Sequence, residues 1–403
     1  MVRLNRAQQQ ERTRAAVLVT ASEEFTEHGY ADAKIDRIAE RAELTRGAVY
    51  SNFPSKRALY LAVLVDLVER PADEQNPPAP PAPPASTAAA LGAFARVWLE
   101  RLPLADATPA GGHLRLRSLT GVLDDPPARA ALAQLIRLEV VLLGLALEAH
   151  QPPATRRVPQ VPRLVRLAEL VLTLLNGSGG FAEAASGIGD PFDVARACEH
   201  LAGIDLADTW NPPYLPYVSP ARPVAETWTP PAGFLDRLTD RPVDLGADGV
   251  IAILGTGRLA AAEEAVRAAR PAEQVTVIVV TSYQAEIGRL VRLRLGDLVG
   301  CLRRVIEPAD AWPLLRLVLD DRAAVAAALG VAASGDATEV AVRIQGGMIV
   351  ARAEGRGAAH AAASAGLPDA GSPSAGLPGS GLPDAGLSSA GRPDGARPSG
   401  TGT

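Results

Sequence analysis

Apolar residues recur at helical spacing through the first seventy positions of the chain. Four helices are predicted there, at residues 7–28, 35–42, 46–52 and 56–70. Gly29 is placed to end the first helix, because glycine readily takes the left-handed conformation that follows many helices. Thr45 is placed to cap the third helix, and Pro54 is placed to stop it. The pattern therefore predicts a small helical domain over residues 1–70.

A second helical region follows a proline-rich stretch at 71–86, whose composition predicts a semi-rigid linker. This region extends from 87 to 208. Its predicted helices are 87–102, 113–123, 127–149, 161–186 and 191–203. Two of these, 127–149 and 161–186, are apolar over much of their surface. Helices of this kind need packing partners on more than one side.

The pattern changes again after residue 208. Residues 209–247 are rich in proline yet contain five of the sixteen aromatic residues of the chain, so this connector is predicted to pack across a domain surface. Strands then alternate with helices over 248–355, which predicts an α/β unit ending in a hairpin. The predicted strands are GVIAIL, VTVIVV, VAVRI and MIVARAE. Residues 356–403 repeat SAGLPDAG-like units without an aromatic residue, and they are predicted to be disordered.

Charge separates the beginning of the chain from the rest. The 403 residues carry a net charge of −5, yet residues 1–60 hold ten lysines and arginines against eight acidic residues. Residues 44–65 include three basic residues and no acidic one. A local basic patch on an acidic protein is typical of a nucleic-acid-binding domain joined to a body that does not bind nucleic acid.

Composition disfavours several classes of protein. The two cysteines, Cys198 and Cys301, are isolated in sequence, so neither a disulfide framework nor a metal site is predicted. The N-terminus lacks an apolar signal-peptide core, and the longest apolar run, near Val140–Leu147, is expected to be too short to cross a bilayer. We therefore expect a soluble cytoplasmic protein with no membrane partner, no metal and no cofactor.

The segment from Ile35 to Tyr60 has the parts of a helix-turn-helix motif. A recognition helix must be short and amphipathic, with an outer face small and polar enough to enter the major groove of DNA. The predicted DNA-facing turn consists of Thr45, Arg46, Gly47 and Ala48. Arg46 is long enough to reach a guanine edge or a phosphate. Tyr50 and Lys56 lie where side chains contact phosphate oxygens on either side.

Residues 10–62 resemble the TetR (tetracycline-repressor) family. The resemblance depends on the pair Gly29-Tyr30, the pair Ile38-Ala39, and the run from Gly47 through Tyr50 and Phe53 to Lys56. The order and spacing of these short motifs agree together, which makes the match specific.

The chain departs from the family pattern at three positions. Lys34 replaces a threonine and is long enough to reach a phosphate. Glu43 replaces the glycine of the turn, which predicts a strained backbone and adds negative charge near DNA. Asn52 replaces a histidine. The predicted DNA-binding residues are Lys34, Thr45, Arg46, Gly47, Ala48, Tyr50, Asn52 and Lys56.

The resemblance also implies that residues 87–208 form a homodimer interface and a ligand pocket. A dimer would place two recognition helices one turn of DNA apart on a palindromic operator of double-stranded DNA. The apolar helices favour a small hydrophobic effector. Polar candidates for its pocket are His113, Glu148, His150 and Asn176, although surface or capping roles are the simpler interpretation of each one. His200 and Cys198 are interpreted as ordinary helix residues.

Two interpretations of residues 248–355 stay open. The first is a dinucleotide site, because the run Gly255-Thr256-Gly257-Arg258-Leu259-Ala260 follows a strand and opens a helix. Against it, the second strand ends at Thr281-Ser282, where an acidic residue should bind the ribose. The second is a resemblance to thioredoxin-like proteins in the final helix and closing hairpin. The loop Gly255–Leu259 has no cysteine, so this interpretation, which we favour, predicts a non-catalytic module without thiol-disulfide exchange.

Together these patterns predict a multidomain protein: an all-α N-terminal helix-turn-helix domain, a helical regulatory domain, a smaller α/β domain that is thioredoxin-like, and a disordered tail. The predicted function is a dimeric DNA-binding regulator, a repressor that a small hydrophobic ligand releases from its operator, and not an enzyme. The alternative is a nucleotide-using enzyme or a partner-docking module in the α/β domain, with the DNA-binding domain for localisation.

Overall fold

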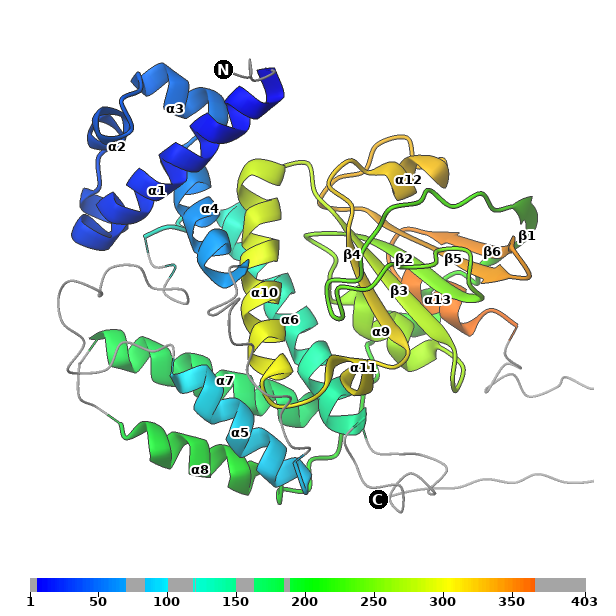
Figure 1. The fold of residues 1–403 in the computed structure, drawn as a ribbon. Coiled ribbons are helices and arrows are strands. Elements are labelled where there is room, and N and C mark those ends of the chain that lie inside the picture. Colours follow the sequence, from blue (N-terminus) through cyan, green and yellow to red (C-terminus); the bar gives the residue numbers. More distant parts are fainter. Residues whose placement is uncertain are drawn as a thin grey trace, which may run out of the picture. The chain divides into compact units, whose positions relative to one another are not determined.

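The computed structural model describes residues 6–69, 84–100, 119, 121–149, 163–184 and 189–366. Residues Met1–Ala365 cluster as one compact unit. The first four helices are α1 (Arg6–Asp32), α2 (Ile35–Arg41), α3 (Arg46–Asn52) and α4 (Lys56–Glu69) (Figure 1). Gly29 interrupts α1 with a φ of 68° and a ψ of 178°, where the sequence predicts the first helix to end. The four predicted helices of the N-terminal region are therefore confirmed, and we call residues 6–69 the head.

Four longer helices form the helical body of the molecule. They are α5 (Thr87–Leu99), α6 (Pro126–Ala149), α7 (Val165–Ala184) and α8 (Pro191–Leu201). The helix predicted at 113–123 lies largely outside the described residues, and residues 121–123 form a turn and a bend. His113 and His150 also lie outside the described part of the chain.

Helix α6 corrects an expectation about membranes. The apolar run around Val140–Leu147 belongs to a 24-residue helix that is long and apolar enough to cross a bilayer by length and composition. The expectation that this run is too short to span a membrane is therefore wrong. Within the fold, 61% of its most apolar window is buried. Its position among the other helices is that of a core helix.

The second half of the chain builds one six-stranded sheet with the order β1-β6-β5-β2-β3-β4. Its strands are β1 (Arg222–Thr227), β2 (Gly249–Gly255), β3 (Gln274–Val280), β4 (Leu315–Leu319), β5 (Glu339–Gln345) and β6 (Met348–Glu354). The strands β2, β3 and β4 are parallel, whereas β5 is antiparallel to β2 and β6 is antiparallel to β5. The associated helices are α9 (Ala261–Ala268), α10 (Arg289–Arg303), α11 (Pro308–Ala311), α12 (Ala324–Ala328) and α13 (Ala358–Ser364). The four predicted strands and the α/β class are confirmed.

Three elements lie where the sequence predicts none. The connector 209–247 contains β1, which pairs with β6 as an edge strand. Strand β4 follows α11 as a short parallel edge strand beside β3. The range predicted as a tail begins with α13, whose alanines are buried against α9 and the sheet. Alanine is the best helix former, so a low-complexity stretch rich in alanine still packs as a helix.

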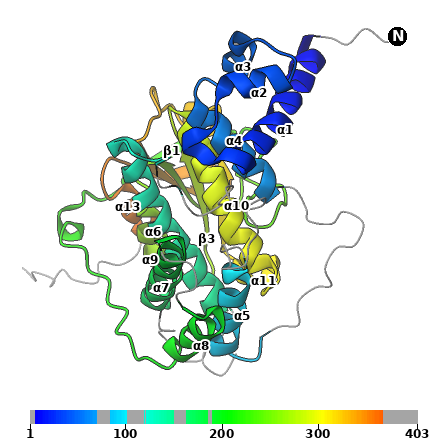
Figure 2. The ribbon, with the colours of Figure 1, turned by 90° about the vertical axis from the view of Figure 1, so that its left-hand side faces the viewer.

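The predicted domain limits stay a prediction. Buried apolar residues continue across these limits in the sequence. One cluster of buried apolar residues runs from Val17 in the head through the helical body to Ala363. Helix α10 is central to it: in Figures 1 and 2 it extends from α4 to α11. Gly296 of α10 permits this packing, because a side chain there would meet Val68 of α4. Arg294 of α10 forms a buried ion pair with Glu139 of α6.

Candidate DNA-binding site

The first turn of α3 is exposed and is held on a buried base. Thr45 caps α3, and its side chain accepts a hydrogen bond from the backbone nitrogen of Ala48 at 3.2 Å. On the inner face, Val49 and Phe53 are each 1% exposed. A Cβ added at Gly47 would have a single atom of the described residues within 4 Å, the Thr45 Oγ1 at 3.9 Å. The turn predicted to enter the major groove therefore faces open space on a rigid support.

Arg46 is the exposed cation of this turn. Its guanidinium lies 3.4 Å from Asp36 of α2 and 5.5 Å from the centroid of the Tyr50 ring. The Arg46 and Asp36 side chains are 61% and 70% exposed. A pair this exposed contributes little to stability, so Arg46 can exchange Asp36 for a phosphate or a base at small cost.

Of three other predicted contacts, Lys56 and Asn52 are held less freely than Arg46, and Lys34 is exposed. Lys56 donates from Nζ to the carbonyl of Ala31 at 2.9 Å and lies 5.1 Å from the Tyr30 ring centroid, and partial burial lowers the pKa of its ammonium. The Asn52 amide donates to the Ala48 carbonyl at 2.9 Å, so it closes the end of α3. Lys34 is exposed and precedes α2 as its N-cap residue.

Glu43 has a φ of +55°, in the left-handed region that favours glycine. A non-glycine residue there costs about 1–2 kcal/mol. We therefore expect Glu43→Gly to raise the free energy of unfolding by about 0.5–1 kcal/mol, since the flexible unfolded chain offsets part of the relief. Removing the carboxylate should also strengthen DNA binding at low salt. Thermal unfolding and a fluorescence titration with duplex DNA measure the two effects, and Glu40→Gln on α2 is the control for charge alone. A destabilised Glu43→Gly protein would contradict the assigned strain.

An ion-pair network fixes α2 on α1. Glu24, Glu27 and His28 place ligand atoms within 4.8 Å of one another, the spacing of a metal site. Guanidinium groups already occupy this cluster, because Arg37 donates to Glu24 at 2.8 Å and Arg41 donates to Glu27 at 2.7 Å. We interpret it as a structural network that sets the angle of α2.

A second polar cluster connects the head to α10, and the sequence gives no local signal for it. Glu286, in the π-turn Gln284–Gly288 before α10, accepts hydrogen bonds from Ser55 and from Arg57. Arg289 lies 5.3 Å from the Phe53 ring centroid and donates to the Ala58 carbonyl at 3.2 Å. Burial lowers the pKa of Arg289 to about 10. We call Ser55, Arg57, Glu286 and Arg289 the brace, because they hold the base of α3 and the start of α4 to the α/β region.

The glycine run after β2 is closed by the chain itself. The nitrogen of Gly257 donates to the Asp336 carbonyl at 2.8 Å, and the nitrogen of Gly255 donates to the Thr338 carbonyl at 2.7 Å. A side chain at Gly255 would overlap the backbone at Gly335 and Asp336. A dinucleotide-binding loop needs such N–H groups for the phosphates. These contacts therefore do not favour the dinucleotide interpretation.

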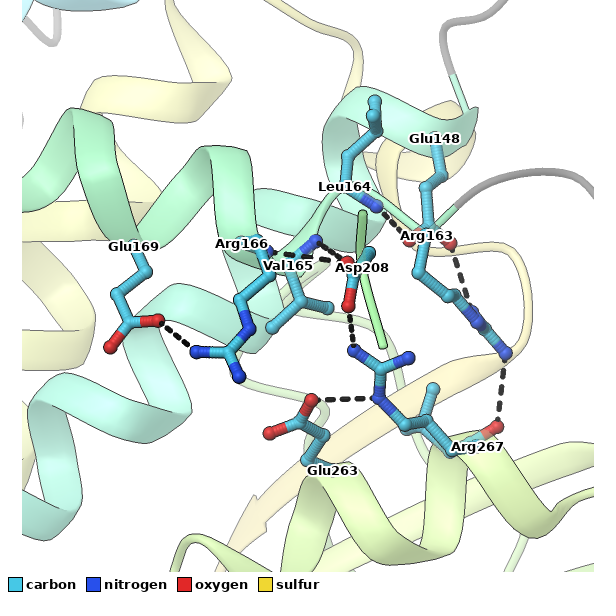
Figure 3. A network of polar contacts seen from close by, with 10 residues as sticks. Glu148, Arg163, Leu164, Val165, Arg166, Glu169, Asp208, Glu263 and Arg267 are labelled. Carbon is cyan, nitrogen blue, oxygen red and sulfur yellow. Dashed lines mark hydrogen bonds and ion pairs between the residues drawn. The ribbon is translucent and has the colours of Figure 1, made fainter. Parts of the chain in front are cut away.

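The polar candidates for an effector site have structural partners. Glu148 accepts hydrogen bonds from Arg163 at 2.9 Å and from the nitrogen of Leu164 at 2.8 Å (Figure 3). Asn176 donates to the Leu172 carbonyl of its own helix at 2.8 Å. Cys198 is fully buried, and burial raises the pKa of its thiol to about 11. His200 contacts the carbonyl of Arg196 at 2.8 Å.

Comparisons with known proteins agree with the geometry of the head. The model of a family described as bacterial regulatory proteins, tetR family, matches residues 17–63. The HTH-type transcriptional activator FasR of Mycolicibacterium smegmatis is 47% identical over 60 residues, which cover 15% of this chain and 27% of FasR. The crystal structure of a Mesorhizobium loti protein assigned to the TetR-family transcriptional regulators is 17% identical, with a TM-score of 0.24, over 50% of this chain and 96% of that one.

The head is a helix-turn-helix domain of the class that bacterial transcription regulators use to bind DNA. Over residues 17–63 the head is similar to the DNA-binding domain of the TetR family. FasR is named as an activator of transcription. The matched segment spans about a quarter of FasR, 27% of its length.

Proposed function

We propose that the protein regulates transcription by binding a palindromic operator in double-stranded DNA as a homodimer, and that a small hydrophobic effector releases it. The observation that carries the proposal is the exposed first turn of α3, capped by Thr45 and supported by buried Val49 and Phe53 within a TetR-family domain. Such a turn fits the major groove, and its exposed arginine fits a phosphate or a guanine edge. We also infer a cytoplasmic location, where DNA is accessible.

Exposed apolar side chains on α7 and α8 support the homodimer. Leu170 and Phe181 of α7 are 37% and 67% exposed, and Phe192 of α8 is 76% exposed. Exposed apolar groups of this size are typical of interaction surfaces. A two-fold contact through these helices would pair two heads about 34–36 Å apart, which is one helical turn of DNA.

We further propose that the α/β region is a thioredoxin-like module without redox chemistry. The order β2-α9-β3-α10, followed by the antiparallel hairpin β5–β6 and the final helix α13, supports this interpretation. The loop after β2 has no cysteine, and Arg258 of that loop is instead paired with buried Glu339. A structural ion pair in the place of a thiolate favours a role in packing and communication.

Arg46→Ala tests the function directly. We expect it to change the preferred operator sequence, with a loss of about 1–3 kcal/mol confined to one base pair of each half-site. Lys56→Ala should weaken binding to all sequences alike and lessen its salt dependence. Footprinting and binding titrations on operator variants measure both, and light scattering reports the dimer. Arg129→Ala, which removes an exposed arginine on α6 away from the proposed dimer helices, is the matched control.

Two outcomes would count against this assignment. Equal loss at every sequence for Arg46→Ala makes Arg46 a phosphate contact. Failure of the wild-type protein to bind any duplex at low salt removes the proposed function. A reporter gene behind the bound operator then decides the mode: we expect repression, whereas activation is the mode in the name of FasR.

A further inference from the structure

A cavity of about 570 Å³ lies between the helical body and the α/β region. Its lining comes from the end of α6, the end of α9, the start of β3 and the segment 311–315 after α10. Leu145 and Val266 form part of the wall, and Trp312, Val275 and Leu315 are lining residues that are themselves at most 4% exposed. The volume is within the range of about 300–1,000 Å³ typical of small-molecule sites.

The charged groups of this cavity are already engaged with the protein, and Arg270 donates to the Ala365 carbonyl at 2.9 Å. Trp312 donates its indole N–H to the Leu142 carbonyl at 2.9 Å, so it offers the cavity only its ring. Glu148 is paired with Arg163, and Arg163 also donates to the Val266 carbonyl (Figure 3). Glu273 is paired with Arg343. Burial raises the pKa of the Glu148 carboxyl, against the opposing charge of Arg163.

These pairings determine the chemistry of a ligand. The two carboxylates and the two guanidinium groups of the lining (Glu148, Glu273, Arg163 and Arg270) balance in charge. A charged ligand would therefore lose its hydration without gaining a net counter-charge, which is unfavourable in an apolar site. An uncharged molecule loses little hydration and gains contacts with apolar side chains and the indole ring. The lining therefore selects against charge and favours an apolar, preferably aromatic, body.

The walls of the cavity are mechanically joined to the DNA-binding head. Helix α10 precedes α11 and Trp312, and its Arg294 is locked to Glu139 of α6. At its other end, Glu286 and Arg289 of the brace hold Arg57 and Phe53. A ligand in the cavity would lie between α6 and the segment 311–315, and α10 is attached to both. A ligand that prefers one separation thus shifts the population of head positions.

We propose that this cavity is the effector site of the protein, that it takes an uncharged, predominantly apolar small molecule, and that α10 and the brace transmit its occupancy to the head. The location is the junction of α6 with the α/β region, not the interior of the helical body. The consequence for DNA rests on the proposed function, whereas ligand binding itself does not.

The probe is N-phenyl-1-naphthylamine, an uncharged dye whose fluorescence rises in apolar surroundings. We expect it to bind the full-length protein, and we expect Ala149→Trp on α6 or Val266→Trp on α9 to weaken binding by about tenfold or more, because either side chain fills the cavity. Ala130→Trp, on an exposed position of α6 outside this cavity, is the matched control and should leave binding unchanged. The sulfonated analogue 8-anilinonaphthalene-1-sulfonate should bind more weakly than the uncharged dye.

The DNA arm measures affinity for duplex DNA with and without the dye. Lower DNA affinity in the presence of the dye, seen in the wild type and in Ala130→Trp but not in the two filled variants, supports the proposal. Equal dye binding in wild type and in both filled variants overturns the site, and tighter binding of the sulfonate overturns the ligand class. Dye binding that leaves DNA affinity unchanged overturns the coupling through α10. A dye-binding protein that never binds DNA supports the cavity and contradicts only the proposed function.

Discussion

Replacing Glu139 by alanine is expected to lower the free energy of unfolding by about 3–5 kcal/mol. The Glu139 side chain is fully buried, and the Arg294 side chain is 6% exposed. Two hydrogen bonds of 2.8 and 2.7 Å join them in a bidentate pair between α6 and α10. Without the carboxylate, the Arg294 guanidinium stays buried with its main partner gone. Urea unfolding followed by circular dichroism measures the change.

Two controls separate this loss from other effects of substitution. The double variant Glu139→Leu with Arg294→Met removes both charges, and we expect it to unfold close to the wild type or above it. Arg166→Ala breaks an exposed ion pair with Glu169 and should change stability by less than about 1 kcal/mol. A Glu139→Ala protein as stable as Arg166→Ala would show that the α6–α10 contact is open to water.

The same pair carries the connection between the α/β region and the head. We expect Glu139→Ala to loosen α10, which begins with Arg289 of the brace and directly follows the turn that contains Glu286. Arg57 of the brace also pairs with Asp125, just before α6, so the head is held from two elements. The α/β region therefore helps to support the DNA-binding head. This role is not evident from the sequence, because the two regions are far apart along the chain.

The DNA-binding head could be predicted closely because its signals are local. Thr45 caps α3 and Pro54 follows its end, so the helix limits Arg46–Asn52 agree with the prediction. Glu43 shows the same point, since its substitution for a glycine predicted strain and its φ is positive. Each of these features depends on residues within a few positions of one another.

Contacts made over long sequence distances could not be predicted in this way. Glu286 meets Arg57 across more than two hundred residues, and no periodicity pairs them. Gly255 and Gly257 did indicate a close approach of backbone, but the partner is the loop at Asp336 and not a ligand. A glycine in a sequence indicates that other atoms approach the backbone closely at that position. Which atoms these are depends on the three-dimensional fold. Strand β1 was missed for a related reason, because its partner β6 lies far along the chain.

A glutamate at position 47 is expected to reduce affinity for operator DNA by about 100-fold or more, which corresponds to about 2.8 kcal/mol. Gly47 lies in the first turn of α3, where the new side chain would carry a negative charge toward the phosphates of the groove. The fold itself should tolerate the change. The nearest described side-chain atom to a Cβ there is Thr45 Oγ1 at 3.9 Å, and an acidic residue near a helix N-terminus is favourable.

Gly47→Gln is the matched control, because it has nearly the same size without the charge. We expect both variants to unfold at or slightly above the wild-type temperature, since replacing a helical glycine gains about 0.5–1 kcal/mol. The difference in DNA affinity between them isolates the electrostatic part, and it should shrink as salt screens the phosphates. Should the glutamate and glutamine variants bind operator DNA equally at low salt, the first turn of α3 does not face the DNA. The recognition surface would then have to be sought elsewhere on the head, with Lys34 and the start of α2 as its nearest exposed cationic element.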